Sequence, residues 1–193
     1  MRTRAHGVAF ALLSLCACSS DDNYVISGYP PIVISPVRSA LHAQMSFKDT
    51  SGAAHPQWVI VLTDAGDVCT KLATHADYFL NPIENYDAVV IWVPPGNVGT
   101  YFIGQENGMG SVAGNEVLAG NAASDAGPAQ FVRLNQVLNV GAYVSLTQFN
   151  VGGGQAIGNF DIGVSAPGGG GTREYAGKFK TNYCVAMETA QLP

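Results

Sequence analysis

The spacing of apolar residues predicts a chain made mostly of β-strands from about residue 37 onward. Apolar residues at positions 41, 43, 45 and 47 alternate with polar ones, which is the two-residue period of a half-buried strand. Residues 58–62 and 88–93 are apolar throughout and indicate central strands that are covered on both faces. Because Pro94-Pro95-Gly96-Asn97 ends the second run, we expect residues 99–103 to follow as its hairpin partner. Further strands are expected at residues 116–118, 130–134, 140–149, 155–165 and 174–187.

One segment, residues 67–80, has the pattern of a helix. Asp67 could cap its start, and Asn81-Pro82 stops it. The apolar residues at helical spacing are Leu72, Ala76, Phe79 and Leu80. Residues 104–128 are rich in Gly, Ala and Asn and predict a long loop around the short strand at 116–118.

The most informative pattern is a repeated Gly-x-Phe near the end of the chain. Gly158-Asn159-Phe160-Asp161 and Gly177-Lys178-Phe179-Lys180 lie nineteen positions apart, across a glycine-rich segment. The repeat predicts two antiparallel strands whose Phe side chains enter one core. A glycine beside each Phe allows a bend or a close approach there.

Composition supports an all-β domain. The chain has 193 residues, of which 47% are hydrophobic and 12% charged, with 23 Gly and 10 Pro. These values exclude a disordered acidic tail and a nucleic-acid-binding protein. We expect an antiparallel β-sandwich of about 8–10 strands with one short helix. A closed or partly open β-barrel is the alternative.

The first seventeen residues have the features of an export signal. Arg2 and Arg4 precede an apolar run at residues 8–15, and small residues follow. The run is too short to span a bilayer, which requires about 20 apolar residues.

The end of this segment resembles the lipobox of bacterial lipoproteins. In Leu15-Cys16-Ala17-Cys18 an apolar residue stands three positions before Cys18 and a small one directly before it, although Cys16 is unusual at the middle position. The resemblance implies lipidation of Cys18, with cleavage before it and acylation of the new N-terminus. Ser19 stands where inner-membrane lipoproteins typically carry Asp, which implies the outer membrane. The alternative is an ordinary secretory signal cut near Ala17, with Cys18 free.

The resulting organisation is a signal peptide at 1–17, a tether at 18–36 and a single domain at 37–193. Loss of residues 1–17 removes two arginines, leaving seven basic and fourteen acidic residues and a charge of −7. A negative surface argues against docking on anionic lipid through charge. The expected partner is therefore the membrane itself, through the anchor at Cys18, with an envelope protein or glycan as a further partner.

Cys69 and Cys184 then remain as an even pair in an exported chain, and we expect a disulfide between them. In the strand pattern Cys184 shares a face with Lys178 and Lys180, which indicates a bridge toward solvent or at an edge. A metal pair or a nucleophilic cysteine is the alternative. The histidines His42, His55 and His75 are scattered without ligand spacing, so no metal site is expected.

The lipobox, the cysteine pair and the two Gly-x-Phe strands together resemble a loose group of uncharacterised bacterial lipoproteins with a β-sandwich domain. This resemblance implies a fold and a location but no activity.

The candidate motifs for catalysis and cofactor binding lack the surrounding residues that such sites need. Residues 108–113 match a dinucleotide-binding fingerprint in form, but no crossover helix follows, so a loop is expected. Asp64 and Asp67 could ligate Ca²⁺, but further acids are not clustered nearby and a turn is favoured. We expect no cofactor, no catalytic residue and no enzyme. The leading hypothesis is a binding or structural domain of the cell envelope.

Two other functions stay open. One is a carbohydrate- or peptide-binding module that uses aromatic side chains, and the other is an envelope hydrolase. The candidate aromatic residues are Tyr24, Tyr29, Tyr78, Tyr86 and Trp92.

Overall fold

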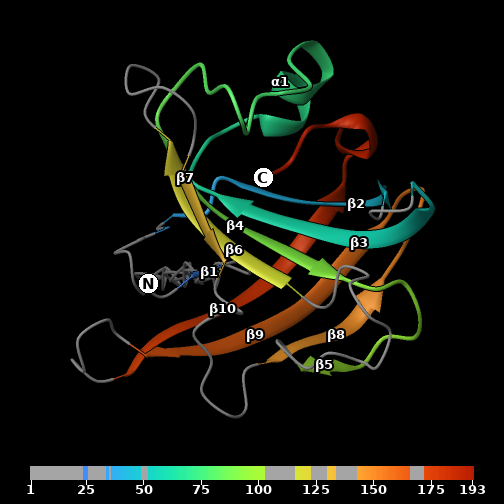
Figure 1. The fold of residues 1–193 in the computed structure, drawn as a ribbon, viewed down its shortest axis with the longest axis vertical. Helices are drawn as coiled ribbons and strands as arrows, with labels where there is room; N and C mark the ends of the chain where they lie inside the picture. The colour runs from blue at the N-terminus through green and yellow to red at the C-terminus, as the bar shows by residue number, and fades with distance from the viewer. Residues whose placement is uncertain are drawn as a thin grey trace, which may run out of the picture.

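The computed structural model describes residues 24–25, 34, 36–48, 52–102, 116–122, 130–133, 143–165 and 172–193. Within them, ten strands form one sheet in the order β5-β8-β9-β10-β2-β3-β4-β6-β7, and β1 pairs with β10 (Figure 1). The strands are β1 (Tyr24–Val25), β2 (Ser39–Lys48), β3 (Ala54–Thr63), β4 (Tyr86–Val93), β5 (Thr100–Phe102), β6 (Glu116–Ala122), β7 (Gln130–Arg133), β8 (Tyr143–Phe149), β9 (Gln155–Ser165) and β10 (Thr172–Tyr183).

The pairing divides the sheet into two halves. Strands β2, β3, β4, β6 and β7 form one antiparallel half, and β5, β8, β9 and β10 form the other. The halves meet where β10 runs parallel to β2, with Asn182 opposite Leu41 and Tyr183 opposite His42. We call this junction the seam. The all-β prediction is confirmed, but the sheet is curled and mixed rather than antiparallel throughout.

One face of the curled sheet encloses what we call the inner core. Its residues come from both halves, so the curl brings β3 and β4 against β8, β9 and β10. Trp58 of β3 also stacks on Phe149 of β8, with ring centroids 4.2 Å apart. The buried members are Ile34, Trp58, Ile60, Leu62, Val89, Ile91, Val93, Val144, Leu146, Phe160, Ile162, Tyr175 and Phe179.

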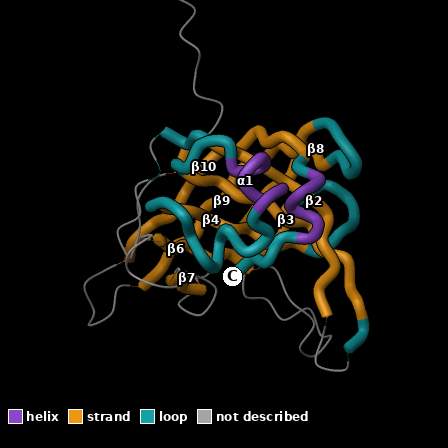
Figure 2. Tube along the Cα trace, turned by 90° about the horizontal axis from the view of Figure 1, so that it is seen from above, coloured by secondary structure: helices purple, strands orange, loops and turns teal. Residues whose placement is uncertain are grey.

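The opposite face of β2, β3 and β4 is covered by what we call the outer core. The helix α1 (Val68–Thr74), the 3₁₀ helix η2 (Val185–Thr189) and the turns after α1 contribute to it. Figure 2 shows the helices lying over β2 and β3. The buried members are Leu41, Ala43, Met45, Val59, Val61, Ala65, Val68, Leu72, Tyr78, Phe79, Tyr86, Ala88, Val90, Cys184, Met187 and Ala190.

The two apolar runs are central strands, as predicted. Residues 58–62 lie in β3 and 88–93 in β4, and both strands supply buried side chains to the inner and outer cores. The predicted hairpin partner of β4 is wrong. β4 lies between β3 and β6, so both of its edges are occupied, and β5 pairs with β8 instead.

The helix α1 is shorter than the segment 67–80 that the apolar spacing predicted. α1 ends at Thr74, whose hydroxyl donates to the Lys71 carbonyl, and the chain then turns so that Tyr78 and Phe79 both enter the outer core. Asp67 is the N-cap residue, but it has a φ of 56° and its side chain makes no capping hydrogen bond. The expected final strand also ends early, at Tyr183, and η2 follows.

The Gly-x-Phe prediction is confirmed in register. β9 and β10 are antiparallel, Phe160 lies opposite Gly177, and Phe179 lies opposite Gly158. Both Phe side chains are buried in the inner core. Each aromatic ring therefore belongs to a cross-strand pair with a glycine, an arrangement that compensates for the missing side chain.

Part of the segment expected to be a tether contacts the domain. Tyr24 and Val25 of β1 pair with Lys178 and Gly177 of β10. Ile34 is fully buried in the inner core. The connection between Cys18 and the folded domain is therefore shorter than residues 18–36.

Replacement of Gly158 by Ala should destabilise the fold. A Cβ there would lie 2.2 Å from the Ser145 carbonyl oxygen and 2.6 Å from Cζ of Phe179, so the strand or the ring must shift. We expect a loss of about 1–3 kcal/mol in the free energy of unfolding, measured in urea. Gly99→Ala is the control, because its Cβ would meet no atom within 4 Å. Equal stability of the two variants would contradict the role given to Gly158.

Candidate functional site

The predicted cysteine pair is present as a disulfide that joins distant parts of the chain. Cys69 lies in α1 and Cys184 follows directly after β10; the two are 115 positions apart in the sequence, and their Cα atoms are 5.7 Å apart. The predicted pairing is confirmed. Cys18 and Ser19 lie outside the described residues.

The expected position of this bridge toward solvent is wrong. Cys184 is fully buried in the outer core, and Cys69 packs against the same core while partly exposed. The strand alternation no longer applies at Cys184, because the chain leaves the sheet there. Its backbone N–H donates to the His42 carbonyl at 2.9 Å, and η2 begins at the next residue. The disulfide therefore fixes the covering layer to the end of β10.

A buried histidine lies at the same seam. His42 is fully buried on the face of β2 opposite the outer core. Its Nε2 is 2.9 Å from the Asn150 carbonyl oxygen, and its Nδ1 is 2.9 Å from the Thr181 hydroxyl oxygen. A carbonyl only accepts, so Nε2 carries the hydrogen. The single hydrogen of the Thr181 hydroxyl faces both Nδ1 and the Ala156 carbonyl oxygen, which is 3.2 Å away. The ring also contacts the edges of Phe149 and Tyr183.

Burial sets the protonation state of His42. Desolvation lowers its pKa, and hydrogen bonds to backbone groups of Asn150 and Asn182 oppose this effect only in part. A neutral ring thus connects β2, the end of β10 and the turn after β8.

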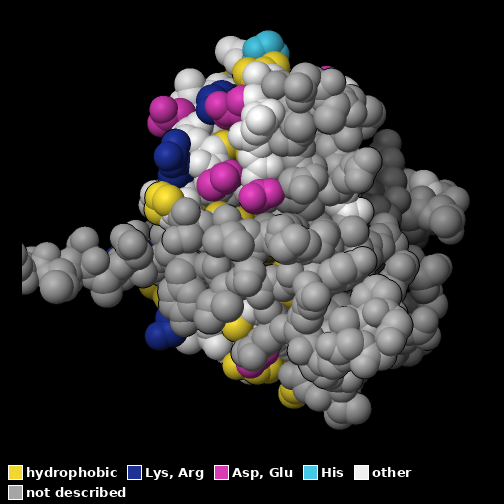
Figure 3. Space-filling model, turned by 90° about the vertical axis from the view of Figure 1, so that its left-hand side faces the viewer, with side chains coloured by type: hydrophobic (Ala, Val, Ile, Leu, Met, Phe, Trp, Pro, Cys, Tyr) yellow, Lys and Arg dark blue, Asp and Glu magenta, His cyan; other side chains and the backbone are white. Residues whose placement is uncertain are grey.

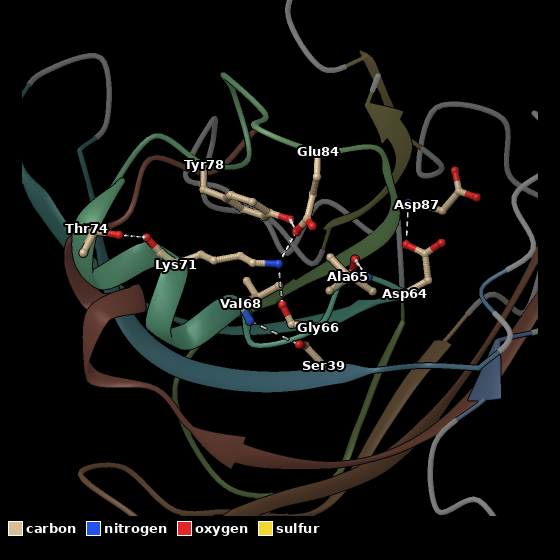
Figure 4. Close-up of polar contacts among 11 residues, drawn as sticks. Ser39, Asp64, Ala65, Gly66, Val68, Lys71, Thr74, Tyr78, Glu84 and Asp87 are labelled. Carbon is tan, nitrogen blue, oxygen red and sulfur yellow. Dashed lines mark hydrogen bonds and ion pairs between the residues drawn. The ribbon is translucent and has the colours of Figure 1, made fainter. Parts of the chain in front are cut away.

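A polar cluster fixes α1 to the chain that enters β4 (Figure 4). Lys71 Nζ donates to the Gly66 carbonyl at 2.6 Å and forms an ion pair with Glu84. The Tyr78 hydroxyl donates to the same Glu84 oxygen at 2.6 Å. Charged side chains of the described residues gather toward this α1 end in Figure 3.

This cluster acts as a structural clamp. Burial and the hydrogen bond to Glu84 raise the pKa of Tyr78, so its hydroxyl stays protonated. Partial burial acts to raise the pKa of Glu84, but hydrogen bonds from Lys71 and Tyr78 hold it below its usual value. Lys71 and Tyr78 both donate to the same Glu84 oxygen, so the three side chains satisfy one another.

The two aspartates considered for Ca²⁺ have structural roles. Asp64 Oδ1 accepts from the Asp87 N–H at 2.8 Å, which ties the turn after β3 to β4. The Asp67 carbonyl accepts from Thr70 and Lys71 in the first turn of α1. Within the described part of the chain, no group of three or more His, Cys, Asp or Glu side chains is arranged to hold a metal ion.

The candidate ligand-binding aromatics whose side chains are described lie in or against the outer core. Tyr78 and Tyr86 are buried there, and the Tyr86 hydroxyl donates to the Phe79 carbonyl at 2.7 Å. Trp92 is partly buried against the same core. The Tyr24 side chain, Tyr29 and the glycine-rich motif at 108–113 lie outside the described part. Buried tyrosines cannot stack on a ligand, so Tyr78 and Tyr86 serve packing.

Sequence reasoning missed His42 as a junction residue and missed the Lys71–Glu84 pair. His42 is one of the polar residues that alternate with apolar ones along β2, and its partner Thr181 is 139 positions away. Lys71 and Glu84 are separated by 13 positions and by the turns after α1. The two residues of each pair are too far apart in the sequence for one helix or one hairpin to bring them together. No local sequence pattern therefore identifies these contacts.

Comparisons with known proteins give no identification. No family model, no curated protein and no solved structure matches the chain. Among the described residues, no helix is long and apolar enough to cross a membrane.

Loss of the disulfide should destabilise the seam. Cys69→Ser and Cys184→Ser should each lower the free energy of unfolding by about 2–5 kcal/mol, because either change removes the same bond. The double variant should cost no more than a single one. Urea denaturation measures the losses, and the mass of the denatured, unreduced protein counts free thiols. Two free thiols in the wild-type protein would contradict the assignment.

Protonation of His42 should destabilise the fold at acid pH. Its pKa is lowered in the folded state, so stability is complete above 6.5, its ordinary value, and falls as pH decreases below that value. His42→Gln should be less stable at neutral pH but should show a flatter decline between about pH 6.5 and 5. Unfolding in urea across this range measures both slopes. His75→Gln, at the exposed end of α1, should keep the wild-type slope; the same slope in all three proteins would refute the assignment to His42.

Proposed function

We propose that this chain is an exported bacterial lipoprotein whose curled sheet is a non-enzymatic binding or structural domain of the cell envelope. In this proposal Cys18 carries the lipid, Ser19 directs the protein to the outer membrane, and the domain contacts an envelope protein or a glycan. The observation that carries the export part is the buried disulfide between Cys69 and Cys184.

The disulfide supports export because structural disulfides form and persist in oxidising compartments and are rare in a reducing cytosol. This bridge is built into the packing rather than added at the surface, since Cys184 is fully buried beside Met187 in the outer core. A fold that depends on such a bond matures best after secretion.

The lipobox-like segment supports lipid attachment independently of the disulfide. Acyl chains on Cys18 would contribute about 0.8 kcal/mol per buried CH₂, so several chains would hold the protein on a membrane nearly permanently. The charged groups near α1 support a binding or structural role over a catalytic one, because Lys71, Glu84 and Tyr78 satisfy each other.

Substitution of Cys18 by Ala tests the proposal. Wild-type protein should incorporate radioactive fatty acid in bacterial cells and sediment with the outer membrane on a density gradient. Cys18→Ala should incorporate none and should be soluble in the export compartment or remain as precursor. Cys16→Ala is the matched control and should be labelled like wild type. Equal labelling of wild type and Cys18→Ala would exclude lipid attachment at this residue.

A further inference from the structure

The two cysteines of the disulfide differ in their access to solvent. Cys69 belongs to α1 and is partly exposed, whereas Cys184 is fully buried. Thr70, the next residue of α1, is exposed, and so is Ala73, which lies one turn further along the same helix face as Cys69. A molecule in solvent can therefore reach this bond from the α1 side, at Cys69.

The chain that follows Cys184 is held in place at several points. The Cys184 N–H donates to the His42 carbonyl at 2.9 Å, and Met187 is fully buried in the outer core. Beyond η2, the Gln191 N–H donates to the Ala76 carbonyl at 2.7 Å. Local opening of the C-terminal segment would have to break these contacts together, so Cys184 stays covered while the domain is folded.

Access decides the course of thiol–disulfide exchange, because the attacking thiolate must reach one of the two sulfurs. When a thiolate attacks Sγ of Cys69, a new S–S bond forms between the attacking sulfur and Cys69. The bond to Cys184 breaks, and its electron pair stays on Cys184, which takes up a proton. Burial disfavours the thiolate form of Cys184, so this step is readily reversed while the outer core is intact. In the reverse step Cys184 attacks Cys69 and expels the partner as a thiolate.

We propose that Cys69 is the sulfur through which this disulfide exchanges with other thiols, and that Cys184 displaces the partner afterwards. The partner is a molecule with a reactive thiol or disulfide, and it is joined to the folded protein at Cys69. This assignment goes beyond the proposed function and does not depend on lipidation of Cys18.

Oxidation of the reduced protein follows the same order. The Cys69 thiolate attacks the partner's disulfide, forms a mixed disulfide and releases one partner sulfur as a thiolate. Cys184 then attacks Cys69, which closes the protein's bond and releases the second partner sulfur. Two protein thiols lose two electrons and two protons, and the partner's disulfide becomes two thiols.

Reduced glutathione is the probe that tests the assignment in the wild-type protein. The folded, oxidised full-length chain is incubated with glutathione, and the reaction is quenched in acid, where thiols exchange very slowly. The masses of peptic peptides then locate each adduct, with Cys16 and Cys18 counted separately. Adducts at Cys69 should exceed those at Cys184 by about tenfold or more. In concentrated urea this preference should disappear, because both sulfurs are then exposed.

Two single variants form a matched pair for the oxidation direction. Cys184→Ser keeps the thiol of Cys69 and Cys69→Ser keeps the thiol of Cys184, while both lose the same bond. With oxidised glutathione, folded Cys184→Ser should form its adduct about tenfold faster than folded Cys69→Ser. The two rates should be similar in urea, and far-UV circular dichroism establishes whether each variant is folded.

The wild-type measurement decides the question even where a variant fails to fold. Adducts at Cys184 that equal or exceed those at Cys69 in the folded protein would overturn the assignment. It would also be overturned by a folded protein that forms no adduct at either cysteine under conditions in which the urea-treated protein reacts, because Cys69 would then be inaccessible.

Discussion

The seam between β10 and β2 is the constraint on which the rest of the fold depends. Each half of the sheet is an antiparallel array, whereas the strand pairing described between the two halves is one parallel contact of two residue pairs, Asn182 with Leu41 and Tyr183 with His42. So short a ladder holds little by itself, and parallel pairing is slightly weaker per residue than antiparallel pairing. Both cores require the halves to stay in this relation.

Three other interactions reinforce the seam from different sides. Inside the curl, the stacked rings of Trp58 and Phe149 join β3 to β8. On β2 the neutral His42 ring uses both nitrogens to bind groups of the other half of the sheet, the Asn150 carbonyl and the Thr181 hydroxyl. Over the outer face, the disulfide joins α1 to the end of β10. Because these contacts share one junction, their contributions are expected to be coupled rather than additive.

The sequence predicts the strands well and their long-range arrangement poorly, for a physical reason. Continuous apolar runs report burial on both faces, which identifies β3 and β4, and the paired Gly-x-Phe motifs report a local antiparallel register. The partner of β5 depends on which edges of β4 are already occupied, and this information lies in β3 and β6. The disulfide could be predicted because two cysteines remain in the exported chain. Its burial could not, because the strand pattern continues through Cys184, whereas the chain leaves the sheet there and forms η2. His42 carries no signal because its partners are distant in the chain.

The position of the disulfide links the folding of this domain to the compartment in which it folds. The two cysteines are 115 positions apart, so closing this loop restricts the unfolded chain strongly. The bond also acts where the sheet is weakest, at the end of the strand that forms the seam. In a reducing cytosol the seam would rely on two backbone pairs and side-chain packing, whereas in an oxidising compartment it becomes covalent. The export signal predicted at the start of the chain would supply that condition. In the proposed function, oxidation after secretion would connect the N-terminal motif with the junction that holds the sheet together.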